Sequence, residues 1–139
     1  MSLYVLDTDV VTLLRGGHPQ ISQRVSSHAP ADLAITIITV EEQLTGWYAR
    51  IRQARKRDEL ARVYQLLTDT VGWFTGRSIL SYTEPAILRY EQLRTMRLNI
   101  GGSDLRIAAI ALEVGAIVVT RNLRDFQRIP NLVVEDWSV

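Results

Sequence analysis

Acidic and amide side chains recur in this chain close to the ends of short apolar runs. These side chains are Asp7, Asp9, Glu42, Asp104, Asn122 and Asp125. Carboxylates gathered in a partly dry cleft repel one another and raise one another's pKa values, so a shared cation makes such a cluster favourable. Oxygen donors of this kind suit Mg²⁺ or Mn²⁺, which can activate water and neutralise charge on a phosphoryl group. If these side chains converge, the natural chemistry is metal-assisted hydrolysis of a phosphodiester.

The apolar runs predict the strands that would bring these side chains together. The runs are Leu3–Leu6, Leu33–Ile38, Ile79–Leu80, Ala116–Thr120 and Leu132–Val134. Continuous Ile and Val runs without polar alternation are typical of strands buried on both faces of a parallel sheet. Helical patterns separate them, which predicts an α/β domain with a mostly parallel sheet. In such sheets ligands bind beyond the carboxyl ends of the strands, where the acidic side chains are expected.

The helices between these strands have recognisable ends. Apolar residues recur at helical spacing over Asp104–Val114, with Ser103 placed to cap the start and Gly115 just past the end. After the second strand, helical spacing continues to about Leu67, as two helices that meet near Arg55–Asp58. No repeat or linker divides the chain, so we expect a single domain over residues 1–139.

Each acidic residue also has a purely structural explanation. Asp7 could cap a helix that begins near Val10. Glu42 stands three residues after Thr39, the spacing of a capping box, and Asp104 could interact favourably with the dipole of its helix. The polar residues after the fourth run suit an ordinary turn. The proposed site therefore depends on the whole set rather than on one member.

The composition limits the remaining classes of function. The chain has 139 residues and no cysteine, which excludes disulfides, thiolate zinc sites and cysteine nucleophiles. The net charge is only +1, so any nucleic-acid surface must be local. The densest basic segment could bind phosphate or be a solvated helix face; it contains Arg50, Arg52, Arg55, Lys56, Arg57 and Arg62. The start lacks a basic leader, and no apolar run approaches the roughly 18 residues that span a bilayer. We therefore expect a soluble, cytoplasmic protein that does not interact with membranes.

Four motifs, in order, resemble those of the PIN-domain family. They are Leu6–Asp9, Ile38–Glu42 leading to Gly46, Asp104–Ala109 and Val119–Phe126. The resemblance covers nearly the whole chain and is greatest to the VapC-like toxin branch, which includes the FitB-type proteins. It implies a three-layer α/β/α sandwich and a Mg²⁺- or Mn²⁺-dependent endoribonuclease. In the family, metal-activated water attacks the phosphodiester and leaves a 5′-phosphate and a 3′-hydroxyl.

The resemblance also assigns roles to individual residues. Asp7, Glu42 and Asp104 match the first, second and third acidic positions of the family, with Asp7 and Asp104 as metal ligands. The fourth position is open: Asn122 stands where some members carry aspartate, and Asp125 supplies a charge nearby. The resemblance further implies an RNA substrate, a cognate antitoxin of a type II toxin–antitoxin system and a homodimer.

Two other interpretations remain. Without a fourth carboxylate, the chain could be a catalytically weak or inactive PIN-fold module that binds RNA or a protein partner. The run Leu6–Val10 also resembles the first motif of haloacid-dehalogenase-like phosphatases. Those enzymes need a cation, usually lysine, beside the phosphoaspartate, and the sole lysine here, Lys56, lies in a charged helix.

Overall fold

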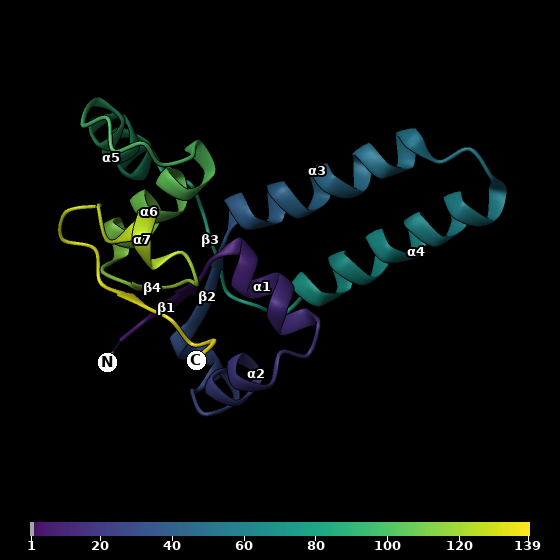
Figure 1. Ribbon diagram of the computed structural model, residues 1–139, viewed down its shortest axis with the longest axis horizontal. Helices are drawn as coiled ribbons and strands as arrows, with labels where there is room; N and C mark the ends of the chain where they lie inside the picture. Colours follow the sequence, from purple (N-terminus) through teal and green to yellow (C-terminus); the bar gives the residue numbers. More distant parts are fainter. Residues whose placement is uncertain (1) are drawn as a thin grey trace.

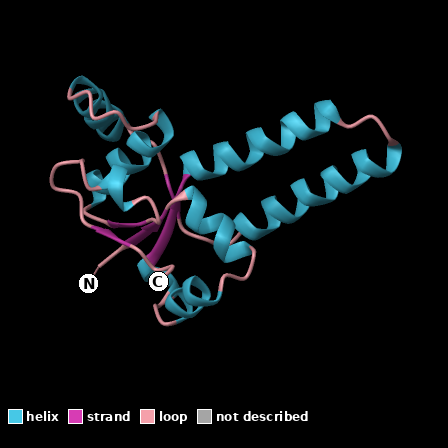
Figure 2. Ribbon diagram, viewed as in Figure 1, coloured by secondary structure: helices cyan, strands magenta, loops and turns pink. Residues whose placement is uncertain are grey.

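The computed structural model describes residues 2–139 and consists of a parallel sheet with helices on both sides (Figures 1 and 2). In chain order the elements are β1 (Tyr4–Leu6), α1 (Thr8–Arg15), α2 (Pro19–Ser26), a 3₁₀ turn (Pro30–Asp32), β2 (Leu33–Thr36), α3 (Ile37–Gln53), α4 (Arg57–Phe74), β3 (Ile79–Leu80), α5 (Glu84–Thr95), α6 (Gly102–Val114), β4 (Ile117–Val119), α7 (Leu123–Phe126) and β5 (Val134–Glu135). The strand order is β3-β2-β1-β4-β5, and every neighbouring pair is parallel.

The first strand lies at the centre of this sheet. On one side β1 pairs with β2, where Val5 lies opposite Ala34. On the other side β1 pairs with β4, where Leu6 lies opposite Val119. The chain thus builds one half of the sheet through β2 and β3 and then crosses to the other half through β4 and β5. A reversal of strand order of this kind leaves a crevice at the carboxyl ends of the central strands.

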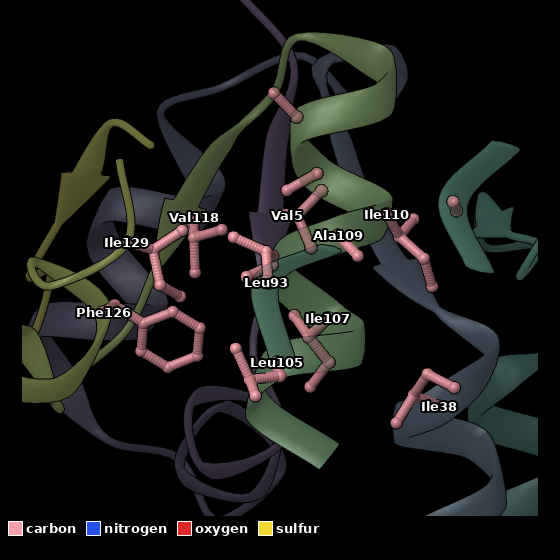
Figure 3. Packing of buried hydrophobic residues seen from close by; sticks show 14 residues of the cluster. Val5, Ile38, Leu93, Leu105, Ile107, Ala109, Ile110, Val118, Phe126 and Ile129 are labelled. Atoms are coloured by element: carbon pink, nitrogen blue, oxygen red, sulfur yellow. The ribbon is translucent and has the colours of Figure 1, made fainter. Parts of the chain in front are cut away.

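Neighbouring residues of the central strands enter two separate cores. Val5 and Val118 pack with α5, α6 and α7 on one face of the sheet (Figure 3). Leu6 and Val119 pack with α1, α2 and the end of α4 on the other face. Successive side chains of a strand point to opposite faces, so both faces of these strands are buried. The expected three-layer α/β/α sandwich is confirmed.

Helices α3 and α4 form an antiparallel hairpin, the arm, that projects away from the sheet (Figure 1). They have 17 and 18 residues, so each extends roughly 25 Å. The two helices meet where the sequence predicted, but α4 continues to Phe74, beyond the expected end near Leu67. Phe74 packs in the core of the sheet, which explains why the helix runs on past the exposed part of the arm. Over residues 2–139, no helix has both the length and the apolar character needed to cross a membrane.

Several predicted boundaries were wrong because side-chain caps start the following helices earlier. The second strand stops at Thr36 rather than at Ile38, since the Thr36 hydroxyl accepts the Thr39 N–H at 3.3 Å and starts α3. Thr39 is therefore not the cap, and the predicted capping box with Glu42 does not exist. The first helix begins at Thr8, two residues before the expected Val10.

The remaining differences are at α6 and at the strand ends. Helix α6 begins at Gly102 with Gly101 as its cap, so Ser103 does not cap it. Gly115 does end the helix, in the left-handed conformation with φ of 68°. Strands β1 and β4 are shorter than their apolar runs, while β5 is shifted to Val134–Glu135. Apolar side chains extend beyond the residues whose backbones pair, because loop residues also fill the core.

The final residues of the chain close the core on the α2 side of the sheet. The Trp137 side chain is wholly buried, and its ring stacks on His28 with a centroid distance of 4.6 Å. Its Nε1–H donates to Glu135 Oε1 at 2.9 Å, so the polar edge of the ring is satisfied. Burial of a large aromatic side chain together with its hydrogen bond makes this residue an anchor for the C-terminus.

We expect Trp137→Ala to lower the free energy of unfolding by about 3–5 kcal/mol, since it removes a large buried aromatic and leaves a cavity. Urea unfolding followed by circular dichroism measures the change. Val139→Ala is the matched control near the C-terminus, because Val139 is 88% exposed. A loss of the same small size in both variants would show that the C-terminal segment is not anchored through Trp137.

Candidate active site at the carboxyl edge of the sheet

The candidate site lies where β1 and β4 end. Asp7 directly follows β1 and Thr120 directly follows β4, and the Asp7 N–H donates to the Val119 carbonyl at 3.0 Å. Helix α3 starts at the same edge, immediately after β2. Helix α6 leads back to the start of β4, so its first turn, which carries Asp104, lies at this edge too. The topology thus brings four elements to one edge of the sheet.

Asp7 is the most buried acid of the site, with 3% of its surface exposed. Its Oδ1 accepts the Val10 N–H at 2.9 Å, so it does cap α1. Burial raises the pKa of its carboxyl to about 6, and repulsion by Asp9 and Asp104 acts in the same direction. Hydrogen bonds from the Thr120 hydroxyl and from Val10 oppose this rise only in part. The capping role and a role in an acidic site therefore coexist in one side chain.

Asp104 lies in the first turn of α6 and is half-buried. Burial raises the pKa of this carboxyl to about 6. Repulsion by Glu42 contributes further, as does repulsion by Asp9 and Asp125. A hydrogen bond from the Asn122 side chain acts in the opposite direction. A first-turn acid that served only the helix dipole would be stabilised in its charged form. For Asp104, burial and then repulsion by other acids outweigh that stabilisation of the charged form.

Glu42 reaches the site from the second turn of α3 and is held there by threonines. Its Oε1 accepts a hydrogen bond from the Thr8 hydroxyl at 2.6 Å. The Thr8 hydroxyl also lies 3.0 Å from the hydroxyl of Thr39, which is wholly buried. The start of α1 and the start of α3 are therefore joined through this carboxylate. The sequence analysis missed both threonines, and only the position of Thr8 between Asp7 and Asp9 could have drawn attention to it.

Asn122 and Asp125 both lie beside Asp104, at the turn after β4. The Asn122 N–H donates to the Thr120 hydroxyl oxygen at 2.8 Å, and its Nδ2 donates to Asp125 Oδ2 at 2.9 Å. Asp125 also forms an ion pair with Arg128 at 3.6 Å. The Asn122 amide is thus hydrogen-bonded to both neighbouring carboxylates, and Asp125 adds a negative charge beside Asp104.

The donor set of this site consists of oxygen atoms, as hard divalent cations prefer. Two carboxyls with raised pKa values, Asp7 and Asp104, are groups whose charged forms a cation would stabilise. Within residues 2–139, no three Asp, Glu or His side chains are arranged as a ready metal cage. Mg²⁺ commonly takes only one or two protein carboxylates and completes its shell with water, so the residues present fit this ion.

A more enclosed, apolar cavity lies away from these carboxylates, on the α1 and α2 side of the sheet. Its volume is about 340 Å³, and its lining includes Leu14, Val25, Trp73 and Arg77. None of the acidic side chains described above lines it. The carboxylates are instead bordered by two open grooves, one beside Asp9 and one beside Glu42. The candidate site therefore lies at the open edge of the sheet rather than in the enclosed cavity.

In metal-free protein, folding stability should fall as the pH rises from about 4 to about 6. The Asp7 carboxyl has a pKa of about 6 in the folded chain against 3.8 without the fold, so the native state holds this proton more tightly and loses that advantage as the pH passes through the interval. Asp7→Asn keeps an oxygen for the Val10 cap and removes the charge. It should raise the free energy of unfolding at neutral pH by about 2–3 kcal/mol.

Urea unfolding in EDTA at acidic and neutral pH measures this effect. The difference between the wild type and Asp7→Asn should be small near pH 4 and largest at neutral pH. Asp58→Asn, which removes an exposed carboxylate from the first turn of α4, is the control and should not become more stable than the wild type at neutral pH. A difference for Asp7→Asn that did not depend on pH would contradict the raised pKa.

Comparison with known proteins gives full-length relatives, although no family model matches the sequence. Ribonuclease VapC1 of Haemophilus influenzae is 32% identical over 142 residues, which cover 98% of this chain and 98% of that protein. The tRNA(fMet)-specific endonuclease VapC of Salmonella typhimurium is 26% identical over 141 residues, or 99% of each chain.

A solved structure shares the fold over the same length. In the crystal structure of the DNA-bound VapBC complex from Salmonella typhimurium, the matching chain superposes with a TM-score of 0.77. It is 27% identical in sequence, and the alignment covers 99% of both chains. With a relative above 30% identity over its whole length and a common parallel sheet, this chain belongs to the VapC family of PIN-domain ribonucleases.

Proposed function

We propose that this chain is an endoribonuclease that hydrolyses RNA phosphodiester bonds with the help of Mg²⁺ or Mn²⁺, and that it is the toxin of a toxin–antitoxin pair. The observation that carries the proposal is the crowding of Asp7, Glu42, Asp104 and Asp125 at the end of the central strands, where burial and repulsion raise two pKa values to about 6. RNA as the substrate is supported by full-length similarity to ribonucleases.

Asp7 and Asp104 are the residues that would hold the divalent ion. Both carboxyls are partly or wholly buried, so they keep fixed positions at the edge of the sheet. When bound, such an ion supplies two things, a more acidic water molecule and neutralisation of the charge that develops on the phosphoryl group. Hydrolysis by water does not use the RNA 2′-hydroxyl as a nucleophile, so the expected products carry a 5′-phosphate and a 3′-hydroxyl.

In this proposal Glu42 orients the attacking water and accepts its proton. Its Oε1 is bound by the Thr8 hydroxyl, which fixes the side chain and leaves Oε2 without a partner among residues 2–139. Asn122, at the fourth acidic position of the family, positions the neighbouring carboxylates. Its amide donates to Asp125 and to Asp104, so it holds two carboxylates that would otherwise separate. An amide can fill this place because Asp125 lies within hydrogen-bond distance and supplies the missing charge.

An antitoxin partner and a homodimer complete the proposal. The structure of a VapBC complex with a chain of the same fold supports a protein partner. Large apolar side chains exposed on the arm and on α5 give the chain surfaces that a partner or a second copy would cover; they include Tyr48, Leu60, Tyr64, Val71, Ile87, Leu88 and Met96. Larger exposed apolar patches on soluble proteins often mark sites of protein–protein contact, so each of these two surfaces is a candidate interface.

Purified protein should cleave RNA in the presence of Mg²⁺ and should lose this activity in EDTA. Asp7→Asn and Asp104→Asn should each lower the rate by at least about 100-fold, because each removes a charge that holds the ion. The measurement is cleavage of total bacterial tRNA and a panel of structured RNAs, followed on denaturing gels. Glu91→Gln, an exposed acid on α5, is the control and should cleave like the wild type. RNA bound but never cleaved, with no effect of either substitution, would favour the inactive binding module instead.

Metal binding should also be visible without any substrate. Mg²⁺ stabilises the folded chain by linkage if it binds only the native state, and the wild type should gain more in melting temperature than Asp104→Asn. In EDTA, Asp104→Asn should be as stable as the wild type or more stable, because repulsion within the site falls. Differential scanning fluorimetry with and without Mg²⁺ measures both effects. Equal Mg²⁺-induced shifts in the two proteins would rule out Asp104 as a ligand.

A further inference from the structure

One row of the α3 surface runs outward from the candidate active site. Residues four apart lie one above the other on a helix, so Glu42, Gly46 and Arg50 form a single row over roughly 12 Å. The glycine interrupts this row and leaves a groove between the other two side chains. The groove has a volume of about 250 Å³, and its lining is completed by Gln43 and Trp47. It is therefore continuous with the site, because Glu42 belongs to both.

Nothing in the fold explains a glycine at position 46. The residue lies inside α3, where glycine is less favourable than alanine. Its backbone is not in the left-handed region, so no φ value demands glycine. A Cβ added there would meet no atom within 4 Å, so no neighbouring element requires the close approach. The absence of a side chain at position 46 leaves an open surface beside Glu42.

On the side away from Glu42, the groove is formed by an arginine that lies over a tryptophan ring. The Arg50 guanidinium lies over the ring of Trp47, 5.1 Å from its centroid. Arg50 is exposed and has no carboxylate partner among residues 2–139. The Trp47 Nε1 is covered and is the one buried side-chain polar atom in this part of the chain without a hydrogen-bond partner. A free guanidinium on an indole is a platform of the kind that binds a base and a phosphate.

The charge distribution along α3 favours a nucleic acid in this groove. The inner end of the row carries the acidic site, which repels a polyanion. The outer end carries Arg50 and Arg52 in the last turn of the helix, and the basic segment continues into the tip of the arm. A nucleic-acid strand that reaches the carboxylates needs cations on the adjacent surface to compensate this repulsion. Arg50 is the cation that lines the groove shared with Glu42.

We infer that Gly46, Trp47 and Arg50 form a nucleotide subsite that positions RNA next to the scissile phosphate. This subsite rests on the proposed ribonuclease function. The RNA strand crosses the groove at Gly46. One of its bases packs against the Trp47 and Arg50 side chains, and Arg50 binds the adjoining phosphate. These residues act on substrate position and affinity rather than on the chemical step.

Two substitutions and two matched controls test the subsite. Gly46→Leu fills the groove with a good helix former, and Gly72→Leu makes the same change in α4, where an added Cβ also meets open space. Arg50→Gln removes the cation of the groove, and Arg52→Gln removes a neighbouring exposed cation from the same helical turn. Binding of a fluorescein-labelled single-stranded oligoribonucleotide of mixed sequence is measured in EDTA by anisotropy, and KM and kcat are measured in Mg²⁺ with total bacterial tRNA.

We expect Gly46→Leu and Arg50→Gln to raise Kd and KM by about tenfold with kcat little changed, as for loss of a stacking and phosphate contact. Gly72→Leu and Arg52→Gln should change both by less than about twofold. Melting temperatures should show that Gly46→Leu is at least as stable as the wild type, so that a loss of binding is not a loss of fold.

Other results would overturn the subsite. Equal effects of Arg50→Gln and Arg52→Gln would indicate general charge attraction, and normal RNA binding by Gly46→Leu would exclude the groove. If Gly46→Leu abolished only neutralisation by a co-expressed partner, the surface would be a protein interface. In all these cases the wild type still cleaves RNA. Wild-type protein that neither binds nor cleaves RNA would instead refute the proposed function, and the subsite with it.

Discussion

Electrostatic repulsion among carboxylates at the end of β1 and β4 is the constraint on which the rest of the structure depends. The fold holds these acids together although burial and mutual repulsion raise the pKa of Asp7 and of Asp104 to about 6. Such an arrangement persists only because the surrounding elements are fixed independently of the site. The two cores on either side of β1 and β4 provide that fixation, since they bury Val5, Val118, Leu6 and Val119 on opposite faces.

Hydroxyl and amide groups form hydrogen bonds to these carboxylates without adding charge to the site. Thr120 binds Asp7, Thr8 binds Glu42, and Asn122 binds Asp104 and Asp125. The hydrogen bonds from Thr120 to Asp7 and from Asn122 to Asp104 favour the ionised forms of these two carboxyls, yet they do not outweigh burial and repulsion. The site is thus held in position while its charge is only partly compensated. A partly compensated, partly buried cluster is what a divalent cation binds with the largest gain.

The sequence predicted the sheet and its edge well because both depend on strong, local patterns. Buried parallel strands need continuous apolar residues. Asp7 follows one of them directly and Asn122 comes shortly after another, so their positions could be inferred from chain order alone. Boundaries that depend on one hydrogen bond were missed, as at Thr36, whose hydroxyl starts α3 two residues early. The link from Thr8 to Glu42 was also missed, since it joins residues 34 positions apart and leaves no periodic signal.

Helix α3 carries residues of opposite charge at its two ends. The first turns of α3 must carry Glu42 into an acidic site, while its last turn carries Arg50 and Arg52. Placing the cations in the last turn also suits the negative end of the helix dipole. Since Glu42 and Arg50 are about two turns apart, roughly 12 Å along the helix, they form no ion pair. Arg50 and Arg52 instead attract a polyanion at a distance from the carboxylates. Gly46 leaves the surface between the two ends of α3 open to an RNA strand that contacts both ends.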